Sequence, residues 1–252
     1  MTHIDKQHID YTLYLVTDRS VMSAKSLEQA VEQAIQGGCT VVQLREKNIT
    51  SREFFETAQR IKQITDFYHI PLIINDRTDI CLAVNAAGIH VGQQDLPAKV
   101  VRSIVGPDKI IGVSAATLSE AMQAEQDGAD YLGVGAMFAT STKTNTRPVT
   151  VEQLVQIKQA VQIPVVAIGG IQSSNAATLT ETGIDGIAST SADLLPYGNY
   201  RLEESKAPEG YLTDGAKAID FSITEDGKIV DLTDKSHSVY NQIKRGDIEG
   251  VK

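Results

Sequence analysis

Short apolar runs alternate with longer amphipathic stretches from about residue 11 to residue 188. The runs are rich in valine and isoleucine and lack a regular polar alternation. That pattern is typical of strands in a parallel sheet buried on both faces. The pattern predicts eight strands, at Tyr14–Asp18, Thr40–Arg45, Pro71–Asp76, Gly88–Gly92, Ile110–Ser114, Tyr131–Gly135, Pro164–Gly170 and, as the weakest, Gly183–Ser189.

The stretches between these runs carry apolar residues at helical spacing. Residues 26–36 are the clearest case, because their apolar residues recur at i, i+3 and i+4 and so form one face. Ser26 is a candidate N-cap, and Gly37-Gly38 is a candidate helix end. Strands that alternate with helices predict an α/β fold. We expect a compact (β/α)8 TIM barrel, with a doubly wound parallel sheet as the alternative.

The pattern changes near residue 190. The segments YGNYRL, KAIDFSIT and KIVDLT alternate polar and apolar residues, with turn signals between them, and they predict antiparallel strands. No amphipathic helix follows the weak eighth strand, so the barrel is expected to be truncated at its eighth β/α unit. We therefore predict a barrel domain at residues 1–190 and a partial antiparallel β segment at residues 191–252.

Composition narrows the classes of function. The formal net charge of −9 argues against a general nucleic-acid surface. Cys39 and Cys81 lie in apolar runs without a metal-binding or redox motif, so we expect buried free thiols in a reducing compartment. No signal peptide is visible, and no apolar segment approaches the ~20 residues that a membrane helix needs. We expect a cytoplasmic protein that binds neither a membrane nor nucleic acid; an oligomer is possible.

Polar residues gather at the predicted carboxyl ends of the strands, where a barrel of this kind carries its active site. The second strand runs into Arg45-Glu46-Lys47, and alternation would place Gln43, Arg45 and Lys47 on one side. The third strand ends at Asn75-Asp76, and Asp95 follows the fourth. Two carboxylates at adjacent strand ends suit a Mg²⁺ ion that takes its other ligands from water and phosphates.

Two further segments suit phosphate groups. Residues 133–143 contain several hydroxyl side chains and end at Lys143. Hydroxyls, backbone N–H groups and an ammonium group are what a phosphate needs. Gly169-Gly170 follows the seventh strand and precedes a predicted helix start at Ser173, where backbone N–H groups and a helix N-terminus favour an anion. Residues 133–143 alone could equally be an ordinary polar loop, and Gly-Gly turns like the one at Gly169-Gly170 are frequent.

Seven of these motifs together resemble the thiamine phosphate synthase family over roughly 175 residues. The resemblance is carried by the order and spacing of YLVTD, QLREK, IINDR, HVGQQDLP, IIGVS, YLGVGAMFATSTK and AIGGI. It implies a transferase that joins hydroxymethylpyrimidine diphosphate to a thiazole phosphate and releases pyrophosphate.

The resemblance also implies roles for single residues. The pyrimidine and its diphosphate would contact Gln43, Arg45, Lys47, Asn75 and Ser114. Asp76 and Asp95 would hold Mg²⁺, the implied cofactor. The thiazole phosphate would face Thr140, Thr142, Gly169 and Ser191. Arg45 and Lys143 would be the catalytic groups, because they would neutralise charge on the departing diphosphate oxygens.

The tail resembles something else. Residues 195–211 are similar to the second half of a Cna-B-type domain from pilins and adhesins, modules that form a Lys–Asn isopeptide bond assisted by a glutamate. Glu204 matches that glutamate and Asn241 matches the asparagine, but the strand that would carry the lysine is absent. We interpret both residues as relics without a partner. The arrangement indicates a fusion of two truncated domains.

Two other functions stay open. A thiazole tautomerase-like paralogue would share the fold but would have no diphosphate to bind through Mg²⁺. An inactive fusion, in which the tail acts as a structural adhesin module, would instead form an isopeptide bond.

Overall fold

The computed structural model of the protein describes residues 6–20, 24–139, 147–190, 198–202 and 219–223. The chain divides into two units, residues 1–194 and residues 195–252. Within the described residues, no helix is both long enough and apolar enough to cross a membrane.

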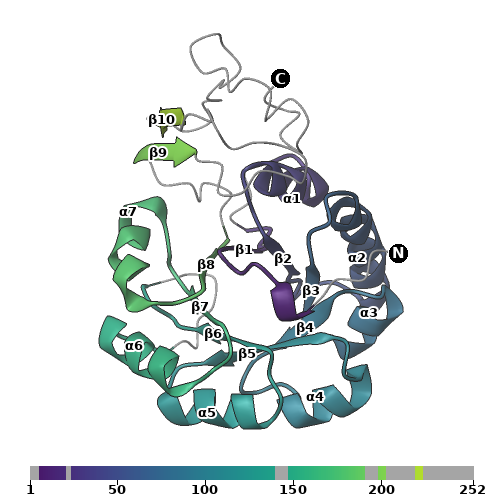
Figure 1. Ribbon diagram of the computed structural model, residues 1–252. Coiled ribbons are helices and arrows are strands. Elements are labelled where there is room, and N and C mark those ends of the chain that lie inside the picture. Colours follow the sequence, from purple (N-terminus) through teal and green to yellow (C-terminus); the bar gives the residue numbers. More distant parts are fainter. Residues whose placement is uncertain (1–5, 21–23, 140–146, 191–197, 203–218, 224–252) are drawn as a thin grey trace, which may run out of the picture. The chain divides into compact units, whose positions relative to one another are not determined.

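Eight parallel strands close into a barrel in the first unit (Figure 1). The strands are β1 (Leu13–Val16), β2 (Val41–Leu44), β3 (Leu72–Asn75), β4 (Gly88–Val91), β5 (Ile110–Ala115), β6 (Tyr131–Val134), β7 (Val165–Ile168) and β8 (Gly186–Ser189). Because β1 pairs with both β2 and β8, the barrel is confirmed and the doubly wound alternative is wrong.

The eighth strand is fully part of the sheet, although its sequence gave the weakest signal. Ala188 pairs with Tyr14 of β1 and with Ile168 of β7, so β8 closes the barrel on both sides. The expected truncation therefore does not remove this strand. Residues 191–197, where the chain continues after β8, lie outside the described part.

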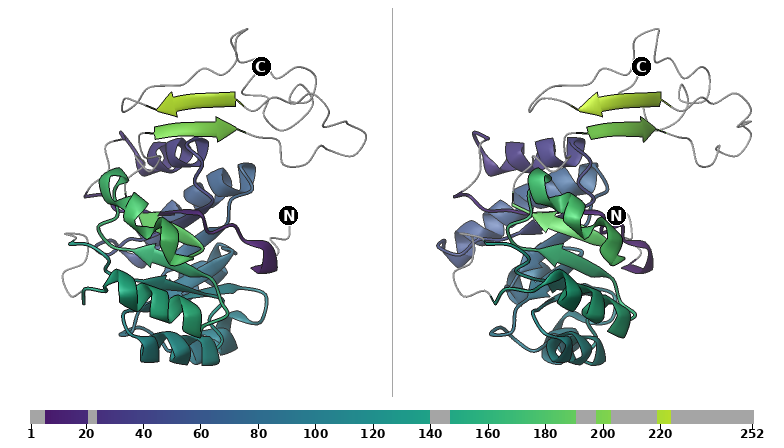
Figure 2. Two further views of the ribbon diagram at one scale, coloured as in Figure 1. Left: turned by 60° about the vertical axis from the view of Figure 1, so that its left-hand side comes forward. Right: turned by 90° about the vertical axis from the view of Figure 1, so that its left-hand side faces the viewer.

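Helices surround the strands as an outer layer (Figure 2). They are α1 (Leu27–Gln36), α2 (Ser51–Phe67), α3 (Thr78–Ala83), α4 (Ala98–Val105), α5 (Leu118–Gln126), α6 (Val151–Ala160) and α7 (Ser173–Ala176), with 3-10 helices η1 (Lys6–His8) and η2 (Ala177–Thr182). Ser26 caps α1 by accepting a hydrogen bond from the N–H of Gln29 at 3.2 Å, and Gly37 ends the helix, as predicted.

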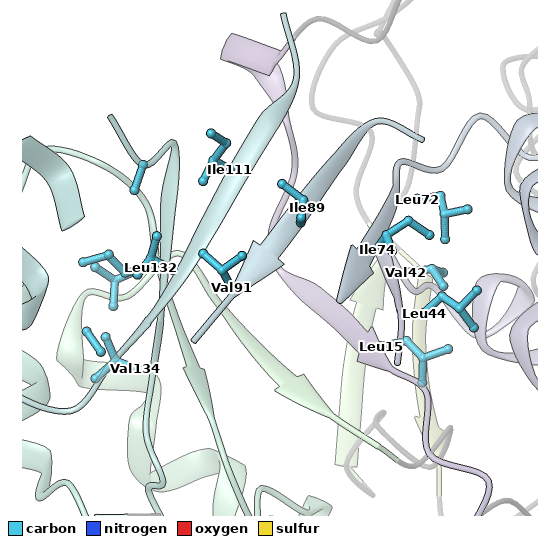
Figure 3. Packing of buried hydrophobic residues seen from close by; sticks show 14 of the residues in the cluster. Leu15, Val42, Leu44, Leu72, Ile74, Ile89, Val91, Ile111, Leu132 and Val134 are labelled. Atoms are coloured by element: carbon cyan, nitrogen blue, oxygen red, sulfur yellow. The ribbon is translucent and has the colours of Figure 1, made fainter. Parts of the chain in front are cut away.

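The strands are buried on both faces, which explains the absence of polar alternation in the sequence. One set of side chains packs outward against the helices, including Leu44, Ile74 and Ile89 (Figure 3). The other set fills the interior of the barrel and includes Tyr14 and Tyr131.

Both cysteines belong to the outer apolar layer and are buried free thiols, as predicted. Burial raises the pKa of the Cys39 thiol and that of the Cys81 thiol to about 11. Each therefore stays protonated at neutral pH and packs as a small apolar group.

The amino-terminal end of the barrel is held by an ionic network. The Arg102 guanidinium of α4 donates to Asp130 Oδ2 at 2.5 Å and to the backbone carbonyl of Gly128 at 3.0 Å. Asp130 Oδ2 also accepts the N–H of Ile111 at 2.8 Å. These contacts tie α4 to the start of β5 and β6. They lie at the end of the barrel that serves stability, opposite the end where active sites form.

A capping box starts α2, and its removal gives a first testable effect. Thr50 Oγ1 accepts the N–H of Glu53 at 3.2 Å, and the Glu53 carboxylate accepts the N–H of Thr50 at 2.8 Å. Thr50→Ala is expected to lower the free energy of unfolding by about 1 kcal/mol in urea denaturation. Glu53→Gln keeps the reciprocal cap and should cost clearly less. Equal losses in the two variants would contradict the capping role of Thr50.

The second unit contains one described pair of strands, β9 (Gly198–Leu202) and β10 (Ile219–Ile223). They pair antiparallel, with Tyr200 opposite Phe221. This confirms the antiparallel β structure that the alternating pattern predicted for YGNYRL and KAIDFSIT. The third predicted strand, KIVDLT, lies outside the described residues.

Candidate active site

Because the strands of the barrel are parallel, their carboxyl ends all open at the same mouth. Thr17, just after β1, binds the residues around the end of β2: its N–H donates to the carbonyl of Gln43 and its Oγ1 accepts the N–H of Arg45, each at 2.9 Å. These two bonds fix the direction in which the chain leaves β2.

Arg45 and Lys47 lie beyond the end of β2, which ends at Leu44. The expectation that strand alternation places both on one side with Gln43 stays a prediction, because the strand ends before either residue. Arg45 Nη1 contacts Asp18 Oδ2 at 3.4 Å, and Lys47 Nζ contacts Asp76 Oδ2 at 2.5 Å. Both cations still face acidic groups at the mouth, held there by ion pairs.

Asp76 and Asp95 come together, as the sequence predicted for successive strand ends. Asp76 has a positive φ of 62°, and its N–H donates to the carbonyl of His90 at 2.8 Å. Asp95 Oδ2 accepts the N–H of Gly92 at 2.7 Å. Partial desolvation raises the pKa of Asp95, and the neighbouring Asp76 carboxylate raises it further, against the lowering effects of Gly92 and Lys47.

This donor set fits a divalent cation. Two neighbouring carboxylates gain from a positive charge between them. The described residues contain no cluster of three or more His, Cys, Asp or Glu side chains that could hold a metal. Mg²⁺ suits a site with two carboxylates, because it keeps several waters and binds substrate phosphates. Asn75, next to Asp76, is buried at the end of β3.

A buried chain of polar side chains crosses the interior of the barrel. Gln43 Nε2 donates to the Tyr14 hydroxyl at 2.9 Å, and the Tyr14 and Tyr131 hydroxyls lie 2.6 Å apart. His90 Nδ1 lies 2.9 Å from the Tyr131 hydroxyl, and His90 Nε2 lies 2.9 Å from Ser114 Oγ. The chain thus joins β2, β1, β6, β4 and β5, and its two ends are predicted substrate-binding residues.

The sequence reasoning missed the three middle members of this chain. Tyr14 and Tyr131 each stand in an apolar strand, where an aromatic residue is ordinary core, and His90 is a single histidine between apolar neighbours. The available signal was that His90 is a polar residue inside an otherwise apolar strand. Asp18, the partner of Arg45, was also missed, although it ends the first predicted strand.

The ends of β6 and β7 pack directly against each other. The N–H of Met137 donates to the carbonyl of Ile168 at 3.0 Å, and that of Phe138 to the carbonyl of Gly169 at 2.9 Å. A Cβ added at Gly169 would lie 2.6 Å from Ala136 Cβ, and the φ of Gly169 is 98°. Glycine is therefore required here, and the backbone after β7 approaches the loop that leads toward Thr140.

Four predicted site residues, Thr140, Thr142, Lys143 and Ser191, lie outside the described residues. The predicted helix start at Ser173 is confirmed, but α7 has only four residues and continues as a 3-10 helix. Such a short helix supplies little dipole, so the expected attraction of its N-terminus for a phosphate is weak. Backbone N–H groups around Gly169 are the stronger candidates.

Two family models match the chain. The first, described as thiamine monophosphate synthase, matches residues 13–192. The second, described as a prealbumin-like fold domain, matches residues 161–236. The two matches overlap at residues 161–192. In the structure, this overlap includes β7, α7 and β8, all of which belong to the barrel unit.

Named relatives agree with the first model. The thiamine-phosphate synthase of Ruminiclostridium cellulolyticum is 62% identical over 187 residues, which cover 74% of this chain and 89% of the relative. That of Clostridium tetani is 59% identical over 182 residues, which cover 72% of this chain and 87% of the relative. The structure of the thiamine phosphate pyrophosphorylase from Pyrococcus furiosus is 40% identical, with a TM-score of 0.67, and covers 73% of this chain and 90% of its own.

Proposed function

Because the chain belongs to the thiamine monophosphate synthase family and is a transferase of thiamine biosynthesis, we propose that its barrel joins hydroxymethylpyrimidine diphosphate to a thiazole phosphate. The products are thiamine phosphate and pyrophosphate. The reaction depends on Mg²⁺. The observation that carries this proposal is the cluster of Lys47, Asp76 and Asp95 at the mouth of the barrel.

The site residues divide between the two substrates. The pyrimidine and its diphosphate lie against Gln43, Arg45, Lys47, Asn75 and Ser114. The thiazole phosphate binds near the backbone of Gly169, which approaches the loop after β6, and near Thr140, Thr142 and Ser191. Asp76 and Asp95 hold the cation. The proximity of the two carboxylates supports this assignment, because a bound cation would reduce the repulsion between them.

The reaction needs charge neutralisation more than acid–base chemistry. The bond between the pyrimidine methylene carbon and the diphosphate oxygen breaks, and its electron pair leaves with pyrophosphate. The lone pair of the thiazole nitrogen forms the new C–N bond. Arg45 and Lys143 stabilise the leaving oxygens, and bound Mg²⁺ would add positive charge to the same group. Holding the two rings side by side supplies much of the remaining rate enhancement.

The carboxylate pair favours this reaction over a tautomerase-like one. A tautomerase has no diphosphate to hold, so it gains nothing from two carboxylates and a lysine at the mouth of the barrel.

We also propose that the functional barrel is residues 1–190 and that residues 191–252 are a partial Cna-B-like segment, which the prealbumin-like match supports. Glu204 and Asn241 lie outside the described residues. Small phosphorylated substrates and a biosynthetic role fit a cytoplasmic location without nucleic-acid or membrane partners.

The full chain tests the transferase proposal directly. With both substrates and Mg²⁺, we expect pyrophosphate release with one thiamine phosphate formed per pyrophosphate. EDTA should stop the release, and added Mg²⁺ should restore it, because the diphosphate oxygens then lose and regain their main counter-charge. Omitting the thiazole phosphate controls for simple hydrolysis. Binding of neither substrate in calorimetry, together with no turnover, would show that this chain lacks the activity of its family.

A further inference from the structure

The hydrogen bonds that link the buried polar side chains inside the barrel all run in one donor-to-acceptor direction, from Gln43 to Ser114. Gln43 presents its amide Nε2 to Tyr14, and an amide nitrogen can only donate. The Tyr14 hydroxyl therefore accepts from Gln43, and among the described residues the acceptor for its own proton is the Tyr131 hydroxyl, 2.6 Å away. Each following link inherits this order.

Both tyrosine hydroxyls are protonated and can therefore donate a hydrogen bond. Complete burial raises the pKa of Tyr14 and that of Tyr131 well above the ordinary value. Both phenols therefore remain protonated at neutral pH. An unpaired buried O–H group costs free energy, which favours the arrangement in which each of these two hydroxyls donates as well as accepts. Tyr131, which accepts from Tyr14, donates to His90 Nδ1 at 2.9 Å.

This order fixes the tautomer of His90. An Nδ1 atom that accepts a hydrogen bond is unprotonated, so the ring proton lies on Nε2 and is donated to Ser114 Oγ at 2.9 Å. A doubly protonated ring would point a second donor at Tyr131 and would leave the Tyr131 proton without an acceptor. His90 is only 6% exposed, so water could hydrate an additional ring proton only poorly.

We propose that Tyr14, Tyr131 and His90 are positioning residues that polarise Ser114. Because Ser114 Oγ accepts from His90, its own O–H is left to donate toward the mouth, where Ser114 is half-buried. Ser114 thus selects a hydrogen-bond acceptor on the substrate, such as a ring nitrogen or a diphosphate oxygen. At the other end, Gln43 has one amide hydrogen committed to Tyr14, which fixes the plane of its amide. The assignment of a substrate to this site rests on the proposed function.

The same row of hydrogen-bonded side chains is also linked to Asp76, one of the two proposed metal ligands. The backbone carbonyl of His90 accepts the N–H of Asp76 at 2.8 Å, while its ring contacts Ser114. One residue of β4 therefore fixes both a predicted metal ligand and a predicted substrate contact. Hydrogen bonds in a low-dielectric interior polarise one another, so the loss of a middle link affects both ends.

The tautomer of His90 tests the direction without any turnover. In the full chain labelled with ¹⁵N-histidine, the ring signals are assigned by their loss in His90→Gln. We expect a protonated Nε2 and an unprotonated Nδ1 at neutral pH. Tyr131→Phe should mix the two tautomers, because Nδ1 loses its donor. A protonated Nδ1 in the unmodified chain, whether alone or together with Nε2, would overturn the proposal.

Tyr11 provides a matched control. Its buried hydroxyl has no hydrogen-bond partner among the described residues, and its ring lies 4.8 Å from that of Tyr131. Tyr11→Phe removes the same atom from the same core without touching the chain of hydrogen bonds. It should therefore leave the His90 tautomer unchanged. A shift in Tyr11→Phe as large as that in Tyr131→Phe would indicate general repacking, and the proposal would fail.

Kinetics then tests the effect on the substrate. For Tyr131→Phe we expect kcat/KM for the pyrimidine diphosphate to fall about tenfold, mostly through KM, with KM for the thiazole phosphate unchanged. Tyr11→Phe should stay within about twofold. An unchanged KM in a folded Tyr131→Phe would overturn the positioning role. If the unmodified protein releases no pyrophosphate, the transferase proposal fails. The tautomer measurement still decides the direction of the hydrogen bonds between Gln43 and Ser114.

Discussion

Replacing Asp95 with asparagine is expected to lower kcat/KM for pyrophosphate release by about a thousandfold. Asp95→Asn keeps an oxygen that can accept the N–H of Gly92, so the loop after β4 keeps its shape. It removes one of the two neighbouring negative charges on which the proposed cation site depends. The loss therefore falls on charge neutralisation of the leaving diphosphate and not on folding.

Initial rates across a range of Mg²⁺ concentrations measure this effect. The half-saturating Mg²⁺ concentration should rise in Asp95→Asn as kcat falls. Asp66→Asn is a matched control, because Asp66 is an acidic residue whose partner is Lys62, one turn earlier in α2. Its kinetics should match those of the unmodified chain. An unchanged dependence on Mg²⁺ in Asp95→Asn would remove Asp95 from the metal site.

Gly186→Ala is expected to lower the free energy of unfolding by about 3 kcal/mol or more. An added Cβ at Gly186 would lie 1.8 Å from the carbonyl oxygen of Tyr11 and 2.5 Å from its carbonyl carbon. Both atoms are backbone, so no side-chain rotation relieves the overlap. Relief requires β8 and the segment before β1 to separate, and that is where the barrel closes.

Urea denaturation of the two variants separates crowding from backbone strain. Gly183→Ala is the control, because Gly183 has a φ of 75° but no atom within 4 Å of an added Cβ. Backbone strain alone should cost about 1 kcal/mol there. Similar losses for the two substitutions would show that β8 and the Tyr11 segment move apart easily, contrary to a tightly closed barrel.

Much of the fold was predictable because its signals are local. The periodicity of residues 26–36, the N-cap Ser26 and the stop at Gly37 are all properties of a short stretch of chain, and all are confirmed. The eight strands were predictable for the same reason, since burial on both faces leaves an apolar run that any reader of the sequence can find.

The candidate site was predictable only in part. Asp76 and Asp95 were placed together correctly, because parallel strands bring their carboxyl ends to one mouth. The placement of Arg45 and Lys47 on one side with Gln43 stays a prediction, because β2 ends at Leu44 and alternation along a strand applies only as far as the strand. Their positions depend on the ion pairs to Asp18 and Asp76, which arise from residues on other strands.

The sequence by itself determined the succession of strands and helices and the residues that carry charge at the strand ends. The tertiary structure alone decided that β8 pairs with β1, and that Tyr14, Tyr131 and His90 meet inside the barrel. Local periodicity reports which face of an element is buried. It does not report which buried side chains meet, because closure of the barrel joins residues that lie far apart in the chain.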